Sequence, residues 1–251
     1  MKRHKNFKAF TESQAKDLLE KYGVIDRLVQ GNQKEISANY SDLAHLYLVV
    51  RERKPFSILE FGSGFSTIVM AYALKQNWDE YHAIAASPQY EKPSIVSIET
   101  TDVWKDNTHN KIKLADLSDF SKITFSKVHI AEYQGQVCHF YDELPDVVPD
   151  FVYLDGPDPM NVEGSIHGIS YKNPTRTVMS GDILKYESTL LPGFFMVVDG
   201  RTNNARFLQR MLKRPYEVQY HTDPDITTFE LTEDRLGKKN IYGYEAYSGK
   251  K

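Results

Sequence analysis

The residues most suited to chemistry or ligand binding lie in the stretch 58–67. There an apolar run ends in a carboxylate, Glu60, and the glycine turn Gly62-Ser63-Gly64 follows. The apolar run is typical of a buried strand, and the spacing after the turn predicts a helix. In a parallel sheet this junction lies at the carboxyl end of the strand, where ligands bind. The glycines would let a ligand approach the backbone closely, and the helix would present free N–H groups.

Glu60 limits the kind of ligand that this turn would accept. A carboxylate at that position repels a pyrophosphate and tolerates a cation. The third glycine of the dinucleotide fingerprint is also missing, because Ser66 and Thr67 follow the glycine pair. Both observations oppose a nicotinamide-dependent oxidoreductase, which stays open as an alternative together with a non-catalytic binding protein. For the turn itself, a purely structural role is the simplest alternative.

Two further carboxylates, Asp155 and Asp199, each follow a short apolar run. Because the carboxyl ends of parallel strands meet at one edge of a sheet, we expect these side chains to lie close together. Like charges repel at such a distance, and a divalent cation between them would relieve the repulsion. Arg201 offers another solution, because its guanidinium can pair with a carboxylate in place of a metal.

The elements that must position these residues follow from hydrophobic periodicity. Short apolar runs predict strands over 57–61, 94–98, 123–130, 151–154 and 194–198. Helical spacing lies between them, most clearly over 67–75 and 180–191. This alternation predicts an α/β protein with a mostly parallel sheet. Near the end of the chain, runs over 217–221 and 227–231 flank a turn signal and predict an antiparallel hairpin.

An N-terminal helical extension over residues 1–53 is expected to precede the main domain over 54–251. The spacing from 11 to 53 is helical, Thr11 and Gln14 offer a capping box, and a second helix is predicted over 41–53. We expect these helices to cover an edge of the sheet or to form part of a substrate entrance. A lid and a homodimer surface are the two further candidates for their role.

Composition excludes several classes of protein. The 251 residues are 41% hydrophobic, carry a net charge of −3 and include a single cysteine, Cys138. This balance argues against an internal disulfide, a membrane span and bulk nucleic-acid binding, so we expect a cytoplasmic protein with neither a membrane nor a nucleic-acid partner. The 16 tyrosines and 13 phenylalanines are many. Those that cluster over 81–90, 133–141 and 242–247 are expected to form an acceptor pocket or to pack at edges.

The order Glu60-Phe61-Gly62-Ser63-Gly64 resembles the first motif of the class I S-adenosylmethionine-dependent methyltransferases. The resemblance covers about residues 56–247 and implies a Rossmann-like, doubly wound, mostly parallel seven-stranded sheet. It also implies S-adenosyl-L-methionine as cofactor, with the glycine loop against its methionine part and Glu60 near its ammonium end. The implied cofactor-binding residues are Glu60, Gly62, Ser63, Gly64, Ser66, Thr67, Glu99, Thr100, Trp104 and Asp155.

Within that resemblance, Glu99 takes the place of the acidic residue that binds both ribose hydroxyls, and its two oxygens suit a vicinal diol. Glu99 follows Glu60 by 39 residues (99 − 60), against roughly 20 in a compact unit. The excess predicts a loop-like insertion over 77–93. Trp104 would stack on adenine, with core packing as its alternative. A surface glutamate at a strand end is the alternative for Glu99.

The turns at Asp155 and Asp199 resemble those of the divalent-metal-dependent O-methyltransferases, including the catechol and macrolide-sugar types. That likeness makes Mg²⁺ at Asp155 and Asp199 a candidate, although Gly200 and Arg201 stand where Asn or Asp usually follows. It implies methylation of an oxygen on a small-molecule or carbohydrate acceptor. No lysine just after Asp155 can act as base, so His167, in the loop 161–172, is predicted for that role. The predicted catalytic set is therefore Asp155, His167 and Asp199, and a merely solvated loop histidine is the alternative for His167.

Overall fold

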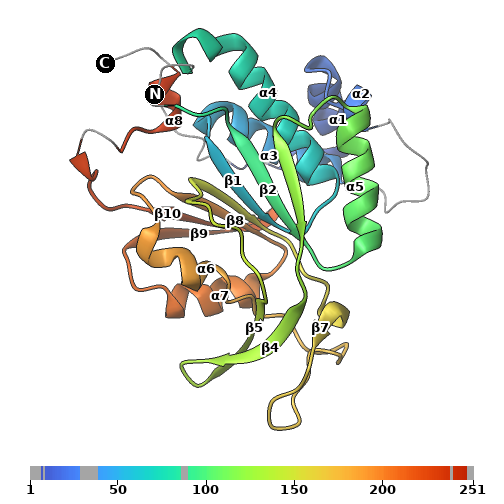
Figure 1. The fold of residues 1–251 in the computed structure, drawn as a ribbon, viewed down its shortest axis with the longest axis vertical. Coiled ribbons are helices and arrows are strands. Elements are labelled where there is room, and N and C mark those ends of the chain that lie inside the picture. The colour runs from blue at the N-terminus through green and yellow to red at the C-terminus, as the bar shows by residue number, and fades with distance from the viewer. Residues whose placement is uncertain (1–6, 8, 29–38, 86–89, 238–239, 248–251) are drawn as a thin grey trace.

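A seven-stranded sheet forms the centre of the computed structural model, which describes residues 7, 9–28, 39–85, 90–237 and 240–247 (Figure 1). The strands lie in the order β3-β2-β1-β6-β8-β10-β9. The first five are parallel, and β10 pairs antiparallel with both β8 and β9. The predicted fold class, including the C-terminal hairpin, is confirmed. The strand bounds are β1 (Ser57–Phe61), β2 (Ser94–Glu99), β3 (Ser121–Phe125), β6 (Phe151–Leu154), β8 (Phe195–Asp199), β9 (Tyr216–Thr222) and β10 (Asp225–Leu231).

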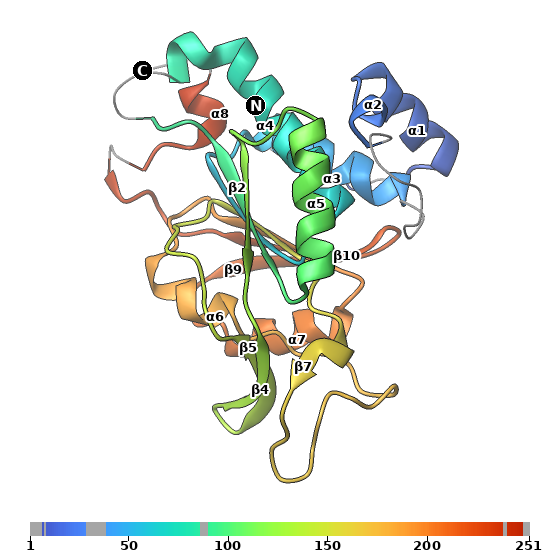
Figure 2. The same ribbon diagram turned by 45° about the vertical axis from the view of Figure 1, so that its right-hand side comes forward.

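Helices cover both faces of this sheet (Figures 1 and 2). One face carries α3 (Tyr40–Arg53), α4 (Phe65–Ala85) and α5 (Asp102–Leu114), and the other carries α6 (Ile183–Tyr186) and α7 (Thr202–Met211). Alternation along β1 divides its side chains between the two cores, since Ile58 packs with α3 and α4 whereas Leu59 and Phe61 pack with α6 and α7. The sheet is therefore buried on both faces, as parallel sheets usually are.

The N-terminal helices begin where the sequence predicts them. In α1 (Glu12–Lys21), Thr11 and Gln14 form the predicted capping box, with N···O distances of 3.1 and 3.3 Å. The helix α2 (Ile25–Leu28) follows, and α3 packs along α4. A short helix, α8 (Gly243–Ala246), closes the described chain beside α3. Within the described residues, no helix is both long and apolar enough to span a membrane.

The predicted strand over 123–130 is wrong, because this stretch forms parts of two strands in two different sheets. Pairing of β3 with β2 ends at Glu99, whose carbonyl accepts a hydrogen bond from Ser126 N at 3.0 Å. The hydroxyl of Ser126 then accepts from Glu143 N at 2.9 Å, which fixes the chain as it leaves the main sheet. A second sheet follows, formed by β4 (Val128–Tyr133), β5 (Gln136–Tyr141) and the short β7 (Val162–Glu163).

The predicted loop-like insertion over 77–93 is also partly wrong. Helix α4 continues to residue 85, and residues 86–89 lie outside the described chain. The polar side chain of Asn77 interrupts the apolar period of α4, yet it is buried and donates to Val50 O at 2.9 Å while accepting from Arg51 at 2.5 Å. These bonds join α4 to α3 and satisfy the amide that makes the sequence look like a loop.

The predicted helix over 180–191 is much shorter than expected. Within 180–191 the chain forms only α6 and the single 3₁₀ turn η2 (Glu187–Thr189) that follows it; another 3₁₀ turn, η1 (Pro159–Asn161), directly precedes β7. Side-chain bonds replace helical ones at the start of 180–191, because Asn204 pairs with both the N–H and the carbonyl of Ser180, and Asp182 accepts from Tyr141 N at 2.8 Å. Such local bonds compete with a helix.

The order of the strands creates the position for a site. Strand β1 lies between β2 and β6, so the chain runs outward in one direction from β1 to β3 and in the other from β6 to β8. In open α/β sheets the crevice at the carboxyl ends of the strands on the two sides of such a reversal is the usual ligand site. Here that crevice lies between the turns that follow β1 and β6.

Candidate active site

A cleft of about 670 Å³ lies at the carboxyl ends of the parallel strands. Its walls come from the turns after β1, β2, β6 and β8, from one side of α5, and from the start of α3. This volume is in the range of small-molecule and cofactor sites. The predicted site residues that line it are Gly62, Ser63, Gly64, Ser66, Glu99, Thr100, Trp104, Asp155 and Asp199.

Two glycines allow the turns after β1 and β6 to touch backbone to backbone. The amide of Gly156 donates to Phe61 O at 2.5 Å. A Cβ on Gly156 would lie 2.8 Å from that same oxygen, and one on Gly62, whose φ is 110°, would lie 3.3 Å from Gly156 N. By contrast, a Cβ on Gly64 would meet no protein atom within 4 Å. At Gly62 the glycine turn thus contacts the turn after β6, and at Gly64 it is open to the cleft.

Glu60 lies beneath this turn rather than in the cleft. Its carboxylate is buried and accepts hydrogen bonds from the hydroxyls of Ser66, Thr67 and Ser97, the last two at 2.6 Å. Burial raises the pKa of Glu60 to about 7, although the three hydroxyls act in the opposite direction. Glu60 and Thr67 are therefore the two predicted cofactor-binding residues that the structure places outside the lining of the cleft, because they fasten the start of α4 to the strands.

Glu99, in contrast, lines the cleft from the end of β2. One carboxylate oxygen accepts from the amides of Thr100 and Thr101 at 2.7 and 3.2 Å, and the other accepts from the Ser63 hydroxyl at 2.9 Å. These bonds hold the carboxylate in one orientation. The first oxygen also accepts from the Thr100 hydroxyl at 3.3 Å, so the remaining acceptor capacity lies on the oxygen that accepts from Ser63. Trp104, in the first turn of α5, lines the same part of the cleft with 36% of its surface exposed.

Asp155 and Asp199 meet in the cleft, as their strand positions predict. Burial and the charge of Asp155 raise the pKa of Asp199 to about 7, while the hydroxyl of Tyr153 donates to its carboxylate. The pKa of Asp155 is also raised by partial burial, although its side chain is open to the cleft. Arg201 opposes both shifts through its charge.

Among the described residues, Arg201 makes no ion pair with a carboxylate, which is one of the roles that the sequence suggests for it. Its guanidinium donates to the carbonyl oxygens of Asp155 and Pro157, and so it holds the turn after β6 against the start of α7. In the part of the chain that the structure describes, no three His, Cys, Asp or Glu side chains are grouped to hold a metal ion. The two aspartates alone do not complete such a site, and Mg²⁺ at Asp155 and Asp199 stays a prediction.

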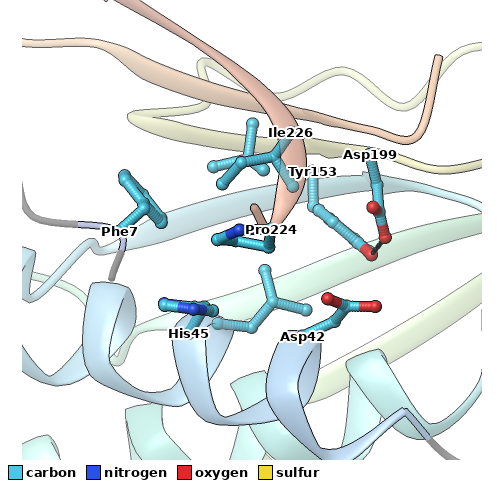
Figure 3. Close-up of a pocket in the computed structure, with 9 residues that line it drawn as sticks. Phe7, Asp42, His45, Tyr153, Asp199, Pro224 and Ile226 are labelled. Carbon is cyan, nitrogen blue, oxygen red and sulfur yellow. Dashed lines mark hydrogen bonds between the residues drawn. The ribbon is translucent and has the colours of Figure 1, made fainter. Parts of the chain in front are cut away.

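A third carboxylate that the sequence does not single out, Asp42, joins this group from the first turn of α3. Figure 3 shows Asp42 on one side of a small apolar hollow, opposite Tyr153 and Asp199. Burial and the charge of Asp155 raise the pKa of Asp42, and Asp42 in turn raises that of Asp199. Nothing in the helical spacing of α3 distinguishes Asp42 from a solvated first-turn acid, so only the packing of α3 reveals it.

The structure does not bring His167 to the cleft. It lies in an exposed turn between Ile166 and Ile169, whose backbones pair across it at 2.9 and 2.8 Å, and its φ is 51°. The chain that follows β7 projects away from the main sheet, beside the β4–β5 hairpin, instead of folding back over the strand ends (Figure 2). The prediction of His167 as base therefore finds no support in its position.

The predicted aromatic clusters lie in different parts of the structure. From the cluster over 133–141, Tyr141 lines the cleft, and Tyr153 joins it from β6. Tyr242 and Tyr244 line a separate hollow of about 220 Å³ beside Phe56 and Phe151, at the other end of the strands. Tyr81 packs edge-on against the ring of Tyr247, with ring centroids 5.8 Å apart. Most of the aromatic excess thus serves packing, and two tyrosines reach the site.

Comparison with known proteins gives likeness of structure only. No protein-family model matches the chain, and no curated protein sequence does. An O-methyltransferase of Streptomyces achromogenes, TomG, solved with S-adenosylmethionine, is 16% identical, covers 90% of this chain and 92% of its own, and has a TM-score of 0.46. The methyltransferase PaMTH1 of Podospora anserina, bound to S-adenosylhomocysteine, is 13% identical, with coverage of 89% and 97% and a TM-score of 0.47.

An O-methyltransferase of Bacillus cereus, solved with S-adenosylhomocysteine, is 13% identical, with coverage of 89% and 92% and a TM-score of 0.44. With TM-scores below 0.5 in all three cases, these likenesses say nothing of the substrate or activity of this chain.

Proposed function

We propose that this chain is an S-adenosylmethionine-dependent methyltransferase that acts on an oxygen of a small-molecule or sugar-type acceptor. The observation that supports this most directly is the composition of one cleft. Eight of the ten residues predicted to bind the cofactor line it, among them Asp155, and Asp199 lines the same cleft. A glycine turn, a strand-end carboxylate and an aromatic side chain are the groups that an adenosyl donor with a diol requires.

The charge of the cleft favours a cationic donor. Acidic residues outnumber basic ones among its lining, with Asp42, Glu99, Asp155, Asp158 and Asp199 against Lys111 and Arg201. S-adenosylmethionine carries a sulfonium and an ammonium group, and it supplies a methyl group activated for nucleophilic attack. Gly64 leaves room for the donor against the backbone, Glu99 is placed to accept from its ribose hydroxyls, and Trp104 offers a stacking surface for adenine.

Asp199 is the residue best placed to remove the acceptor proton. A base works most effectively when its pKa lies near the working pH, and the pKa of Asp199 is raised to about 7. In the proposed step the acceptor oxygen forms a bond to the methyl carbon as the carbon–sulfur bond breaks. The electron pair goes to sulfur and the hydroxyl proton goes to the Asp199 carboxylate. Tyr153 holds that carboxylate in position through its hydroxyl.

Calorimetric titration of the purified chain with S-adenosylhomocysteine and, separately, with NAD tests the donor assignment. We expect saturable binding of S-adenosylhomocysteine at one site per chain and no heat from NAD. Binding of NAD without binding of S-adenosylhomocysteine would overturn the proposal. Release of S-adenosylhomocysteine from S-adenosylmethionine, measured with a panel of hydroxylated small molecules and sugars, tests the acceptor class, and transfer only to amines or thiols would contradict it.

A further inference from the structure

One buried polar atom of a residue that lines the cleft has no hydrogen-bond partner within the described chain. The hydroxyl of Tyr141 is buried, and none of the described residues donates to it or accepts from it. The residue is 1% exposed, yet it is part of the wall of the cleft together with Ser63, Glu99 and Asp155. A buried hydroxyl without a partner is unfavourable, and native structures seldom retain one unless a water or a ligand completes it.

The ring of Tyr141 is held firmly at this place. Tyr141 is the last residue of β5, its backbone N–H donates to Asp182 at 2.8 Å, and its ring centroid lies 5.8 Å from that of Phe61. Phe61 directly precedes the glycine turn, so the tyrosine lies against the base of the turn. Because both the backbone and the ring are fixed, the hydroxyl cannot easily turn away to find another partner.

We propose that the Tyr141 hydroxyl is a binding group for the S-adenosyl donor, to which it gives a hydrogen bond beside the glycine turn. This inference rests on the proposed function of the cleft and adds a residue that the second sheet contributes to it. The hairpin β4–β5, which lies between β3 and β6 in the chain and belongs to the second sheet, thereby delivers a polar group to the donor.

The donor, rather than the acceptor, is the partner that the surroundings favour. The ring of Tyr141 packs on Phe61 at the end of β1, and Tyr141 does not line the small hollow of Figure 3, where Asp42 and Asp199 lie. The charged groups that act on it are Asp182, Glu99, Arg201 and Glu60. Burial keeps the pKa of Tyr141 well above its usual value. The hydroxyl therefore stays protonated and can donate throughout the working pH range.

Two other tyrosines provide matched controls. The hydroxyls of Tyr216 and Tyr247 are likewise buried without a partner among the described residues, but neither residue lines the cleft. If an unpartnered hydroxyl were only a local imperfection of packing, removing any of the three would have the same effect. If the Tyr141 hydroxyl forms a hydrogen bond to a ligand, only the removal of this hydroxyl should change ligand binding.

The test measures S-adenosylhomocysteine affinity by calorimetry, and the melting temperature of the ligand-free protein, for Tyr141→Phe, Tyr216→Phe and Tyr247→Phe. We expect Tyr141→Phe to bind about 5- to 50-fold more weakly, because the ligand loses one buried hydrogen bond. Its ligand-free melting temperature should not fall, since the hydroxyl has no partner to lose. The two control variants should bind S-adenosylhomocysteine like the unchanged chain.

Two outcomes would overturn the inference on its own. Either Tyr141→Phe binds S-adenosylhomocysteine as tightly as the unchanged chain, or its ligand-free form melts clearly lower, which would show that the hydroxyl serves folding. Failure of the unchanged chain to bind S-adenosylhomocysteine at all is a different result. It would remove the proposed function and the inference with it, and the titration of the unchanged chain identifies that case before any variant is compared.

Discussion

The carboxylates on the two sides of the cleft differ in their surroundings. On the side of β1 and β2, where we propose that the donor binds and which we call the donor half, hydroxyl and amide groups donate to Glu99 in the wall and to Glu60 beneath the glycine turn. The side of β6 and β8 is the acceptor half. In the acceptor half, beside β6 and β8, carboxylates raise the pKa of one another, with Asp155 acting on both Asp42 and Asp199. The carboxylates of the donor half therefore accept hydrogen bonds within the protein, whereas those of the acceptor half repel one another.

This difference indicates which half is built for rigidity and which for reaction. A carboxylate with fixed donors is preorganised and holds the glycine turn and the start of α4 in place. Carboxylates that repel one another bind a proton or a cation readily, which suits a group that must take a proton from an acceptor. Removing the Glu60 carboxylate should therefore cost stability, and removing the Asp199 carboxylate should cost activity.

The largest effect is expected from Glu60→Leu. This change removes the common acceptor of three hydroxyls, from Ser66, Thr67 and Ser97. We expect the free energy of unfolding in denaturant to fall by about 3 kcal/mol, because buried hydroxyls without partners are costly. Glu60→Gln, which keeps one acceptor oxygen and the shape, should lose less. Equal stability of Glu60→Leu and the unchanged chain would show that burying this carboxylate costs as much as its bonds provide.

Asp199→Asn should separate activity from stability. We expect its rate of S-adenosylhomocysteine release, with an acceptor from the panel, to fall by about 100-fold, because asparagine cannot take a proton. The rate of the unchanged chain should rise with pH to a plateau above about 7, following the raised pKa of Asp199. A variant that retains most of its rate would assign the base elsewhere and would remove the contrast between the two halves.

The stability of the same variant should depend on pH in a defined direction. The folded chain binds the Asp199 proton more tightly than the unfolded chain, since the pKa rises from 3.8 to about 7 on folding. This group therefore favours folding fully below pH 3.8, and that contribution is lost as the pH rises through about 7. Relative to the unchanged chain, Asp199→Asn should gain stability across that window, and thermal melting at pH 5 and pH 8 checks the sign.

Glu99→Gln is expected to have an intermediate effect on the donor half. Replacing the carboxylate by an amide leaves one acceptor oxygen for a diol, so calorimetric affinity for S-adenosylhomocysteine should fall by about 10-fold. Asp102→Asn, which changes an exposed acid near Glu99 that does not line the cleft, is the matched control. If both variants bind alike, Glu99 holds only the amides of Thr100 and Thr101 and does not contact the donor.

The sequence predicts the main sheet well, because its strands carry strong local signals. Continuous apolar runs such as 151–154 can only be buried strands in an α/β context, and a Pro-containing turn between two alternating runs marks the final hairpin. The second sheet could not be separated from β3, because apolar residues continue on both sides of the break at Ser126. Only the end of pairing with β2 shows where the chain leaves.

The position of a candidate site residue can be predicted where it follows from a strand end, although its role stays a prediction. Glu99, Asp155 and Asp199 reach the cleft because the carboxyl ends of parallel strands must meet. His167 lies away from the cleft. The loop that carries it is long enough to turn toward the strand ends or away from them, and proximity in sequence to Asp155 does not determine which. Asp42 was missed for the opposite reason, since its position depends on how α3 packs across the sheet, which no local pattern encodes.

Asp42→Asn should give the smallest effect and the sharpest test of the acceptor half. Asp42 raises the pKa of Asp199 through its charge, so removing that charge should lower the pKa of Asp199. The pH profile of the rate should then move to lower pH, with a rate at pH 6 that is higher by less than about threefold. Affinity for S-adenosylhomocysteine should change little, because the donor residues Glu99 and Ser63 are unaffected. A profile that stays in place would show that Asp42 and Asp199 do not interact, and the acceptor half would then reduce to the pair on β6 and β8.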